Sequence, residues 1–174
     1  IPKQKIIEFI NKNLGEELGE DFSPFFEEIK NLISNKDFED ASEKLAGFLA
    51  EHSDNVEAIS LYIDCLGSLS KYDDVNEFIK SLSEDIIKKP EIASSISNIE
   101  IKKSGNLQPS IGELEKKFNL DKKNINNLIS LSEKYYAEGS IDHSFELLIN
   151  NYTDFKSNDQ QIIKETLVKY FNAL

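Results

Sequence analysis

The stretch Phe38-Glu39-Asp40-Ala41-Ser42-Glu43-Lys44-Leu45 recurs in phase along the chain, and this recurrence decides the predicted fold. Its first position falls on Phe38, Tyr72, Leu107 and Ile141, which are 34, 35 and 34 residues apart. Its fourth position falls on Ala41, Val75, Ser110 and Ser144, and its eighth on Leu45, Ile79, Leu114 and Leu148. A period of 34 residues with a small or β-branched residue between large apolar ones is typical of a helix–turn–helix solenoid.

Apolar residues at helical spacing predict helices on both sides of each recurrence, with ends marked by capping residues, Pro and Gly. The predicted starts are Ser23-Pro24, Asp37, Ser53-Asp54-Asn55, Asp73, Pro90, Pro109-Ser110, Asp121 and Ile141. Gly105 is expected to end one helix and Gly139 to turn the chain. A last helix from about Asn158 to Phe171 would close the array with a polar outer side. We therefore predict an all-α fold of about four helix hairpins, with an extra N-terminal helix and a C-terminal capping helix.

The same patterns divide the chain into three segments. Residues 1–14 carry an apolar stripe at helical spacing but fall outside the 34-residue phase, so we expect a separate terminal helix. Residues 15–21 are predicted to be a short acidic linker, and residues 22–174 the helical repeats. Since the chain contains no Met, we expect it to be a piece of a longer protein.

Composition and charge narrow the possible functions. The net charge is −12, and residues 15–100 carry 21 acidic side chains against seven Lys. Such a surface repels phosphate backbones, so we expect no nucleic-acid partner. The chain has no run of 18 apolar residues and no signal-peptide pattern, so we expect no membrane partner. The densest acidic run, from Glu16 to Glu28, is either a solvated linker and helix face or a docking patch for a basic partner.

Few residues could carry chemistry. His52 and His143 lie 91 positions apart, and no zinc-binding spacing surrounds either of them. Cys65 is the only cysteine, which excludes an internal disulfide. It has no CxxC partner and no Lys within four residues, so we interpret it as a small buried side chain, with a redox role as the alternative. With no Gly-rich phosphate loop and no GxSxG motif, we expect no enzyme activity, cofactor or metal site.

The repeats resemble tetratricopeptide repeats, since Ala41 keeps the signature Ala of that pattern and Phe25, Ile59 and Leu128 hold the place of its Trp. The two ends narrow the resemblance. Residues 2–14, PKQKIIEFINKNL, resemble the last helix of a thioredoxin domain. Residues 137–148 and 164–174, AEGSIDHSFELL and KETLVKYFNAL, resemble the last repeats and closing helix of the chaperedoxins, bacterial proteins that join a thioredoxin domain to tetratricopeptide repeats.

This resemblance implies a cytoplasmic bacterial co-chaperone with an upstream thioredoxin-like domain in the same parent chain. Such proteins are ATP-independent holdases that bind unfolded client proteins under stress and deliver them to the chaperonin or other ATP-driven chaperones. The thioredoxin Cys pair is absent from this chain, so the chain itself cannot perform disulfide exchange.

The resemblance also implies a partner-binding groove. Certain positions on the first helix of each repeat usually line the inner face of a tetratricopeptide array. They fall on Phe26, Lys30, Ile33, Asp64, Ile129, Glu133 and Tyr136, among others. An apolar groove with a polar rim would suit a client-holding surface. Alternatively, neighbouring helices cover these residues, because burial cannot be inferred from periodicity.

The predicted function is therefore a protein-binding helical repeat domain that acts as a holdase without ATP. The first alternative is a scaffold that assembles one specific complex and has no general chaperone activity. A helical enzyme is a further alternative, which a deep polar pocket with clustered carboxylates or His would support.

Overall fold

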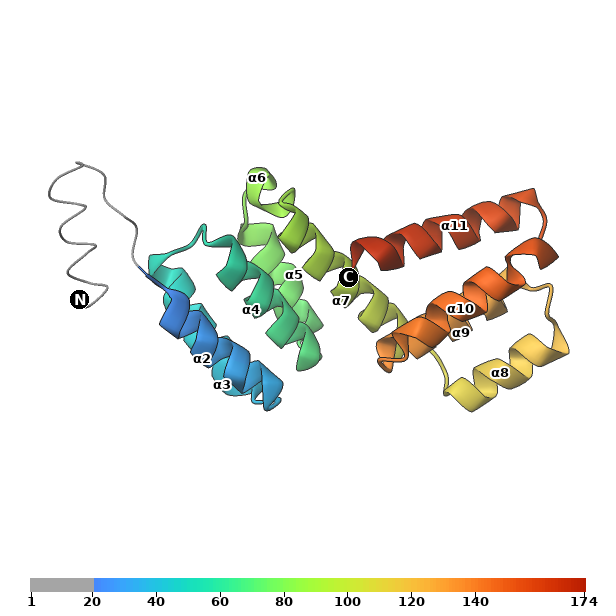
Figure 1. Ribbon diagram of the computed structural model, residues 1–174, viewed down its shortest axis with the longest axis horizontal. Helices are drawn as coiled ribbons and strands as arrows, with labels where there is room; N and C mark the ends of the chain where they lie inside the picture. Colours follow the sequence, from blue (N-terminus) through green and yellow to red (C-terminus); the bar gives the residue numbers. More distant parts are fainter. Residues whose placement is uncertain (1–20) are drawn as a thin grey trace, which may run out of the picture.

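The computed structural model describes residues 21–174, and every regular element among them is a helix (Figure 1). The helix predicted for residues 1–14 and nearly all of the linker predicted for residues 15–21 lie outside the described residues. The first helices are α2 (Ser23–Ser34), α3 (Phe38–Glu51), α4 (Val56–Ser68), α5 (Tyr72–Ser81) and the short α6 (Glu84–Ile87). They are followed by α7 (Pro90–Asn106), α8 (Ile111–Leu120), α9 (Ile125–Ala137), α10 (Ile141–Asn151), the 3₁₀ turn η1 (Tyr152–Asp154) and α11 (Ser157–Asn172). The chain has an all-α, helical-repeat fold.

Three helix pairs are joined by the same tight turn. The turns of α2/α3, α4/α5 and α9/α10 each contain one residue with positive φ: Lys36 at 65°, Ser70 at 58° and Gly139 at 84°. In each turn the next amide donates back over the helix end, from Asp37 to the Leu32 carbonyl, from Lys71 to Leu66 and from Ser140 to Tyr135, all at 2.9 Å. This is the hydrogen bond that closes a Schellman-type helix end, and it folds the second helix of each pair back along the first.

The third copy of the 34-residue pattern departs from this arrangement. Leu107, which fills the first position, is 79% exposed, and Ser110 precedes α8 instead of lying inside it. Ser110 and Glu113 form a capping box that starts α8 four residues later than the phase predicts. As a result, α8 packs against α9 and does not fold back along α7 (Figure 1).

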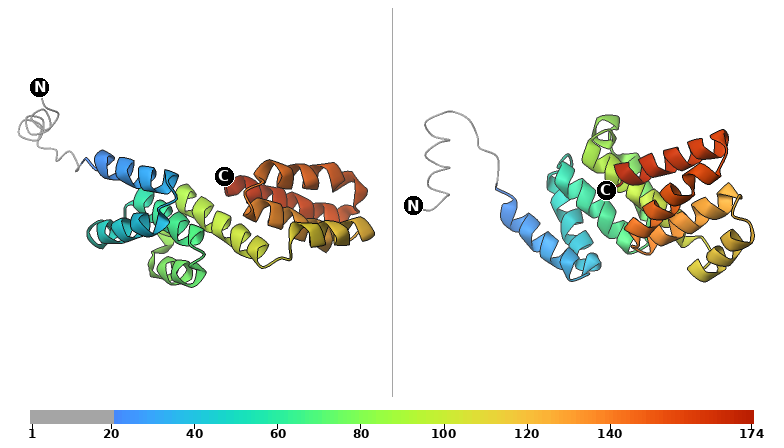
Figure 2. Two further views of the ribbon diagram at one scale, coloured as in Figure 1. Left: turned by 90° about the horizontal axis from the view of Figure 1, so that it is seen from below. Right: turned by 45° about the vertical axis from the view of Figure 1, so that its right-hand side comes forward.

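Two hydrophobic cores meet at α7. The first core gathers buried side chains of α2 to α5, including Ile29, Leu45 and Ile63, together with Ile92 and Ile99 of α7. The second gathers those of α8 to α11 together with Ile101 of α7. Figure 2 shows α7 as the long helix between the two groups. The molecule therefore consists of two groups of helices, each with its own core, and α7 contributes to both.

Glycines allow α7 to approach its neighbours closely. A Cβ on Gly67 of α4 would overlap the Ile99 side chain, and a Cβ on Gly105 would overlap the backbone of Glu133 in α9. The sequence predicted that Gly105 ends this helix, and α7 ends one residue later, at Asn106. What the site requires is the absence of a side chain, not a change of backbone direction.

Two predicted caps also differ. Ser23 lies inside α2, whose N-cap is Phe22, and Asp121 is the C-cap of α8. The cap of α9 is Asn124, whose side chain accepts from the amides of Asn126 and Asn127. The cap of α4 lies within the predicted segment Ser53-Asp54-Asn55: the Asn55 side chain accepts from the Ala58 amide at 2.9 Å. Each N-terminal segment offers several acceptors, and the sequence does not decide which one the helix start uses.

The last helix packs back over the middle of the chain. α11 contacts α7 and α9 as well as α10, and the C-terminus lies beside α7 (Figure 1). Tyr170 of α11 is fully buried, and its hydroxyl lies 2.9 Å from that of Ser132 in α9. α11 is therefore part of the second core and more than a cover at the end of the array.

Candidate functional site

The structure divides the predicted inner-face residues into buried and accessible ones. Phe26 belongs to the first core, and Tyr136 is 2% exposed, with its ring 4.8 Å from that of Tyr170. For these two residues the second alternative of the sequence analysis applies, because neighbouring helices cover them. Ile33 and Ile129 are half-buried beside the cores. Two of these four apolar residues are therefore covered and do not offer a surface to a partner.

The polar members of the set have local partners. Lys30 pairs with Glu57 at 2.8 Å, and Glu133 accepts a hydrogen bond from Ser104 at 2.6 Å. Asp64 accepts a hydrogen bond from Ser95 at 3.2 Å. Lys30 thus contacts α4, and Asp64 and Glu133 contact α7; Glu57, the partner of Lys30, also lines a shallow groove.

That groove, here called the α4–α7 groove, has a volume of about 430 Å³. It lies at the N-terminal ends of α4 and α7, away from the contact between Gly67 and Ile99. Its lining residues are Val56, Glu57, Ser60, Leu61 and Glu91. Val56 and Leu61 make its surface mainly apolar, while Glu57 and Glu91 lie in the first turns of their helices, where the helix dipole favours a carboxylate.

A short chain of hydroxyls connects the groove to a buried carboxylate. The hydroxyls of Ser60 and Ser95 lie 2.8 Å apart, and Ser95 donates its proton to Asp64 Oδ2. Because each hydroxyl has one proton, Ser60 donates to Ser95 and keeps only acceptor capacity toward the groove. Asp64 Oδ1 is buried without a hydrogen-bond partner among the described residues. Burial raises the pKa of Asp64, and the Ser95 hydrogen bond and the charge of Lys102 only partly oppose this rise.

A second candidate surface comprises apolar residues of α10, η1 and α11 together with Leu174. Val168, Phe171 and Leu174 are all more than half exposed, and Phe171 is 74% exposed. Ile149, Tyr152, Lys164 and Leu167 line a shallow apolar depression of about 290 Å³, with Lys164 Nζ 5.6 Å from the centre of the Tyr152 ring. The six apolar residues form what we call the C-terminal apolar surface: Ile149, Tyr152, Leu167, Val168, Phe171 and Leu174. The predicted polar outer side of the last helix is therefore only partly right.

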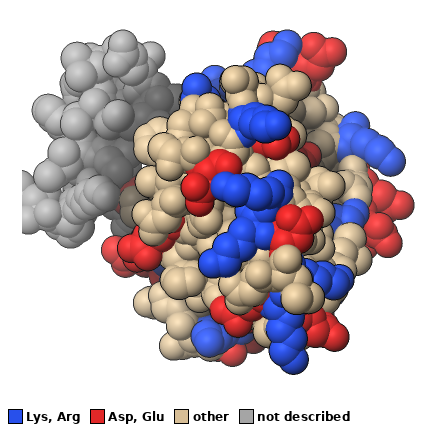
Figure 3. All heavy atoms as spheres, turned by 90° about the vertical axis from the view of Figure 1, so that its right-hand side faces the viewer, with Lys and Arg blue, Asp and Glu red and all other residues tan. Residues whose placement is uncertain are grey.

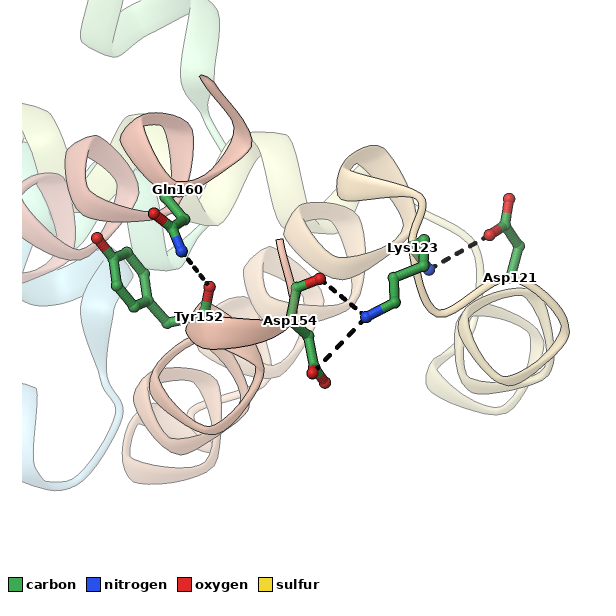
Figure 4. Close-up of polar contacts among 5 residues, drawn as sticks. All are labelled: Asp121, Lys123, Tyr152, Asp154 and Gln160. Carbon is green, nitrogen blue, oxygen red and sulfur yellow. Dashed lines mark hydrogen bonds and ion pairs between the residues drawn. The ribbon is translucent and has the colours of Figure 1, made fainter. Parts of the chain in front are cut away.

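Charges on this half of the molecule are mixed. Residues 101–174 carry ten acidic side chains and ten Lys, and Figure 3 shows both signs interspersed on the end of the molecule formed by this half. Some are used internally. Lys123 donates to the backbone oxygen of Asp154 at 2.8 Å and lies 3.6 Å from its carboxylate. Gln160 donates to the backbone oxygen of Tyr152 at 3.3 Å (Figure 4). These contacts connect η1 to the loop before α9 and to the first turn of α11.

Cys65, His52 and His143, the residues considered above for chemistry, all pack against neighbouring side chains. Cys65 is in the first core, and burial together with the neighbouring Asp64 raises the pKa of its thiol to about 11, so it is a poor nucleophile at neutral pH. His52 packs against Phe22 and Phe48, and His143 against Tyr135. Within residues 21–174 no group of three or more His, Cys, Asp or Glu side chains could hold a metal ion. Over the same range no helix has the length and apolar character needed to cross a membrane.

The sequence analysis did not assign Glu91, Ser95 or the residues of the C-terminal apolar surface to a candidate site. The inner-face positions were assigned only to α2, α4 and α9, so α7 was not considered. The clustering of small residues at Ser60, Gly67 and Ser95 was the available signal that α4 and α7 lie close together.

No model of a known protein family matches this chain, and a comparison with curated proteins also finds no match. Function must therefore be argued from the two surfaces themselves.

Proposed function

We propose that this chain is a protein-binding helical repeat domain that acts as a holdase and covers exposed apolar segments of unfolded client proteins without ATP. The observation that carries this proposal is the C-terminal apolar surface. Val168 and Phe171 lie three positions apart on α11, so their side chains share one side of the helix, and the exposed Leu174 follows two residues after the helix ends. Contiguous exposed apolar surface is costly in water and usually marks a protein-binding site.

The charge around this surface supports the same proposal. The second half of the chain has no net charge, since its acidic side chains and Lys are equal in number. A client segment of either sign would therefore meet little net repulsion there. Transfer of bound clients to the chaperonin or another ATP-driven chaperone belongs to the proposal through the chaperedoxin resemblance alone.

Light scattering of a heat-unfolded client enzyme tests the holdase function. We expect stoichiometric amounts of the chain to slow aggregation, because the C-terminal apolar surface would cover apolar segments that otherwise associate. The double variant Val168→Ser/Phe171→Ser should lose most of this effect. Leu120→Ser is the matched control, because Leu120 is 88% exposed but lies on α8, outside this surface.

Three results would refute the proposal: no protection by the unaltered chain, full protection by the double variant, or equal loss with Leu120→Ser. Adding chaperonin and ATP to the protected client tests the transfer step, and we expect recovered client activity.

The alternative, a scaffold for one complex, predicts stoichiometric binding of one native partner and no binding of unfolded clients. Titrating native and unfolded forms of the same client separates the two functions.

A further inference from the structure

The α4–α7 groove lies in the other half of the molecule and has a different chemistry from the C-terminal apolar surface. Every polar side chain that lines it offers an acceptor: the carboxylates of Glu57 and Glu91, and the Ser60 oxygen, whose proton goes to Ser95. Glu91 forms no ion pair among the described residues, and Glu57 has one partner, Lys30. A ligand that complements this lining must supply donors and positive charge.

The groove also provides apolar surface for the rest of such a ligand. Val56 and Leu61 are its apolar lining residues, and both are partly buried against the first core. A volume of about 430 Å³, open to solvent, is large enough for one long side chain together with its neighbours in an extended segment. The aliphatic part of a Lys or Arg side chain packs on apolar residues while its charged end meets the carboxylates.

We propose that the α4–α7 groove binds an extended segment of a partner protein through a Lys or Arg side chain that meets Glu57 and Glu91, next to an apolar residue that packs on Leu61. The acidic charge of residues 15–100, with 21 acidic side chains against seven Lys, attracts such a segment before contact. This binding is separate from the holdase proposal, since it uses another surface and another chemistry.

Lys30 provides a further test of this proposal. Its Nζ lies 2.8 Å from Glu57, so it occupies one of the two carboxylates that the incoming cation would use. Both side chains are about half exposed, which leaves Lys30 free to swing away from Glu57. Lys30 thus competes with the partner, and removing its charge should strengthen binding.

Fluorescence anisotropy with a short labelled peptide of alternating Leu and Lys tests this proposal on the full chain. We expect saturable binding that weakens as salt rises from about 50 to about 500 mM, because exposed charges are screened. Glu57→Gln and Glu91→Gln should each weaken binding about two- to fivefold, the range expected for one exposed charge pair. Lys30→Gln should tighten binding by a similar factor. Glu146→Gln, on the exposed side of α10, is the matched control and should change nothing.

Peptides and variants give distinguishable outcomes. A peptide with Glu in place of Lys should not bind, and one with Ser in place of Leu should bind more weakly. The proposal is overturned if Glu146→Gln weakens binding as much as Glu91→Gln, if Lys30→Gln weakens it, or if the Glu peptide binds equally. Equal affinity for spermidine would also overturn it, since a free polyamine would then satisfy the groove without a protein segment. Val168→Ser/Phe171→Ser should leave peptide binding intact, so a failure here is separable from a failure of the holdase proposal.

Discussion

At the scale of single residues, Asp64 lies in a site that disfavours its charged form. It is largely buried, one carboxylate oxygen has no hydrogen-bond partner, and desolvation raises its pKa. A group with a raised pKa in the folded state binds its proton more tightly there than in the unfolded chain. The free energy of unfolding therefore falls as pH rises from the unfolded pKa of the group to its folded pKa.

Asp64→Asn should stabilise the protein at neutral pH. The amide carries no charge to desolvate, so we expect a gain of about 1 kcal/mol at pH 7, the usual scale for a buried unsatisfied polar group. The gain should shrink toward zero at about pH 3, where the native carboxyl is protonated as well. Urea denaturation at several pH values measures both, with Asp54→Asn in an exposed loop as control. A gain independent of pH would contradict the assignment.

Replacing glycine with alanine should have opposite effects on stability at Gly105 and Gly112. Gly105→Ala should destabilise the protein by about 1 to 3 kcal/mol, because the new methyl group would meet the backbone of α9, which cannot move aside like a side chain. Gly112→Ala should stabilise it by up to about 1 kcal/mol, since a Cβ on Gly112 meets open space inside α8. Thermal unfolding of both variants is the measurement, and equal effects would show that Gly105 is not a contact residue.

At the scale of elements, the three recurring turns show how the repeat is built. Gly139 adopts its positive φ without strain, whereas Lys36 and Ser70 do so with a side chain that the left-handed region disfavours. The turn geometry is thus kept while the residue best suited to it is present in only one copy.

Ser70→Gly should therefore stabilise the α4/α5 hairpin. We expect a gain of about 0.5 to 1 kcal/mol, because glycine relieves the left-handed strain at the helix end. Ser70→Ala is the matched control and should give no gain, since alanine keeps the Cβ. Gly139→Ala should show the reverse effect in the α9/α10 turn. Chemical denaturation of the three variants checks the prediction, and a gain from Ser70→Ala would exclude strain as the cause.

Element by element, the sequence predicted what depends on local chemistry. The starts of α3, α4, α5 and α10 and the span of α11 were predicted within about one residue. The short α6 was not foreseen, because it lies between stronger signals and has no 34-residue counterpart. Leu107 matches the phase yet is exposed, since the Pro109-Ser110 segment starts a new helix there. The candidate surfaces depend on which helices touch, and hydrophobic spacing shows the buried face of a helix without showing what covers it.

At the scale of the whole molecule, stability should be divided between the two cores. Ile92 and Ile99 of α7 belong to the first core and Ile101 to the second, so α7 is the main connection between them. In repeat proteins each unit is stabilised by its neighbours, and distant units are coupled only through those between them.

Leu148→Ala should therefore unfold the molecule unevenly. The side chain is fully buried in the second core, and its loss should cost about 2 to 5 kcal/mol there. Hydrogen exchange should speed up most in α9 to α11, less in α7 and least in α2 and α3. In Leu45→Ala, which alters the first core, hydrogen exchange should instead speed up most in the helices of that core and least in α9 to α11. Uniform loss of protection in both variants would mean that the two cores unfold as one unit.

The shared helix α7 also sets a rule for length variation. Ile99 and Ile101 are two positions apart yet serve different cores, so the relative orientation of the two halves is fixed by the helical rotation between those positions. One inserted residue inside α7 would turn everything after it by about 100° around the helix axis. Insertions should thus be tolerated in the segment 107–110, where the backbone leaves the helix, and be disruptive only a few residues earlier.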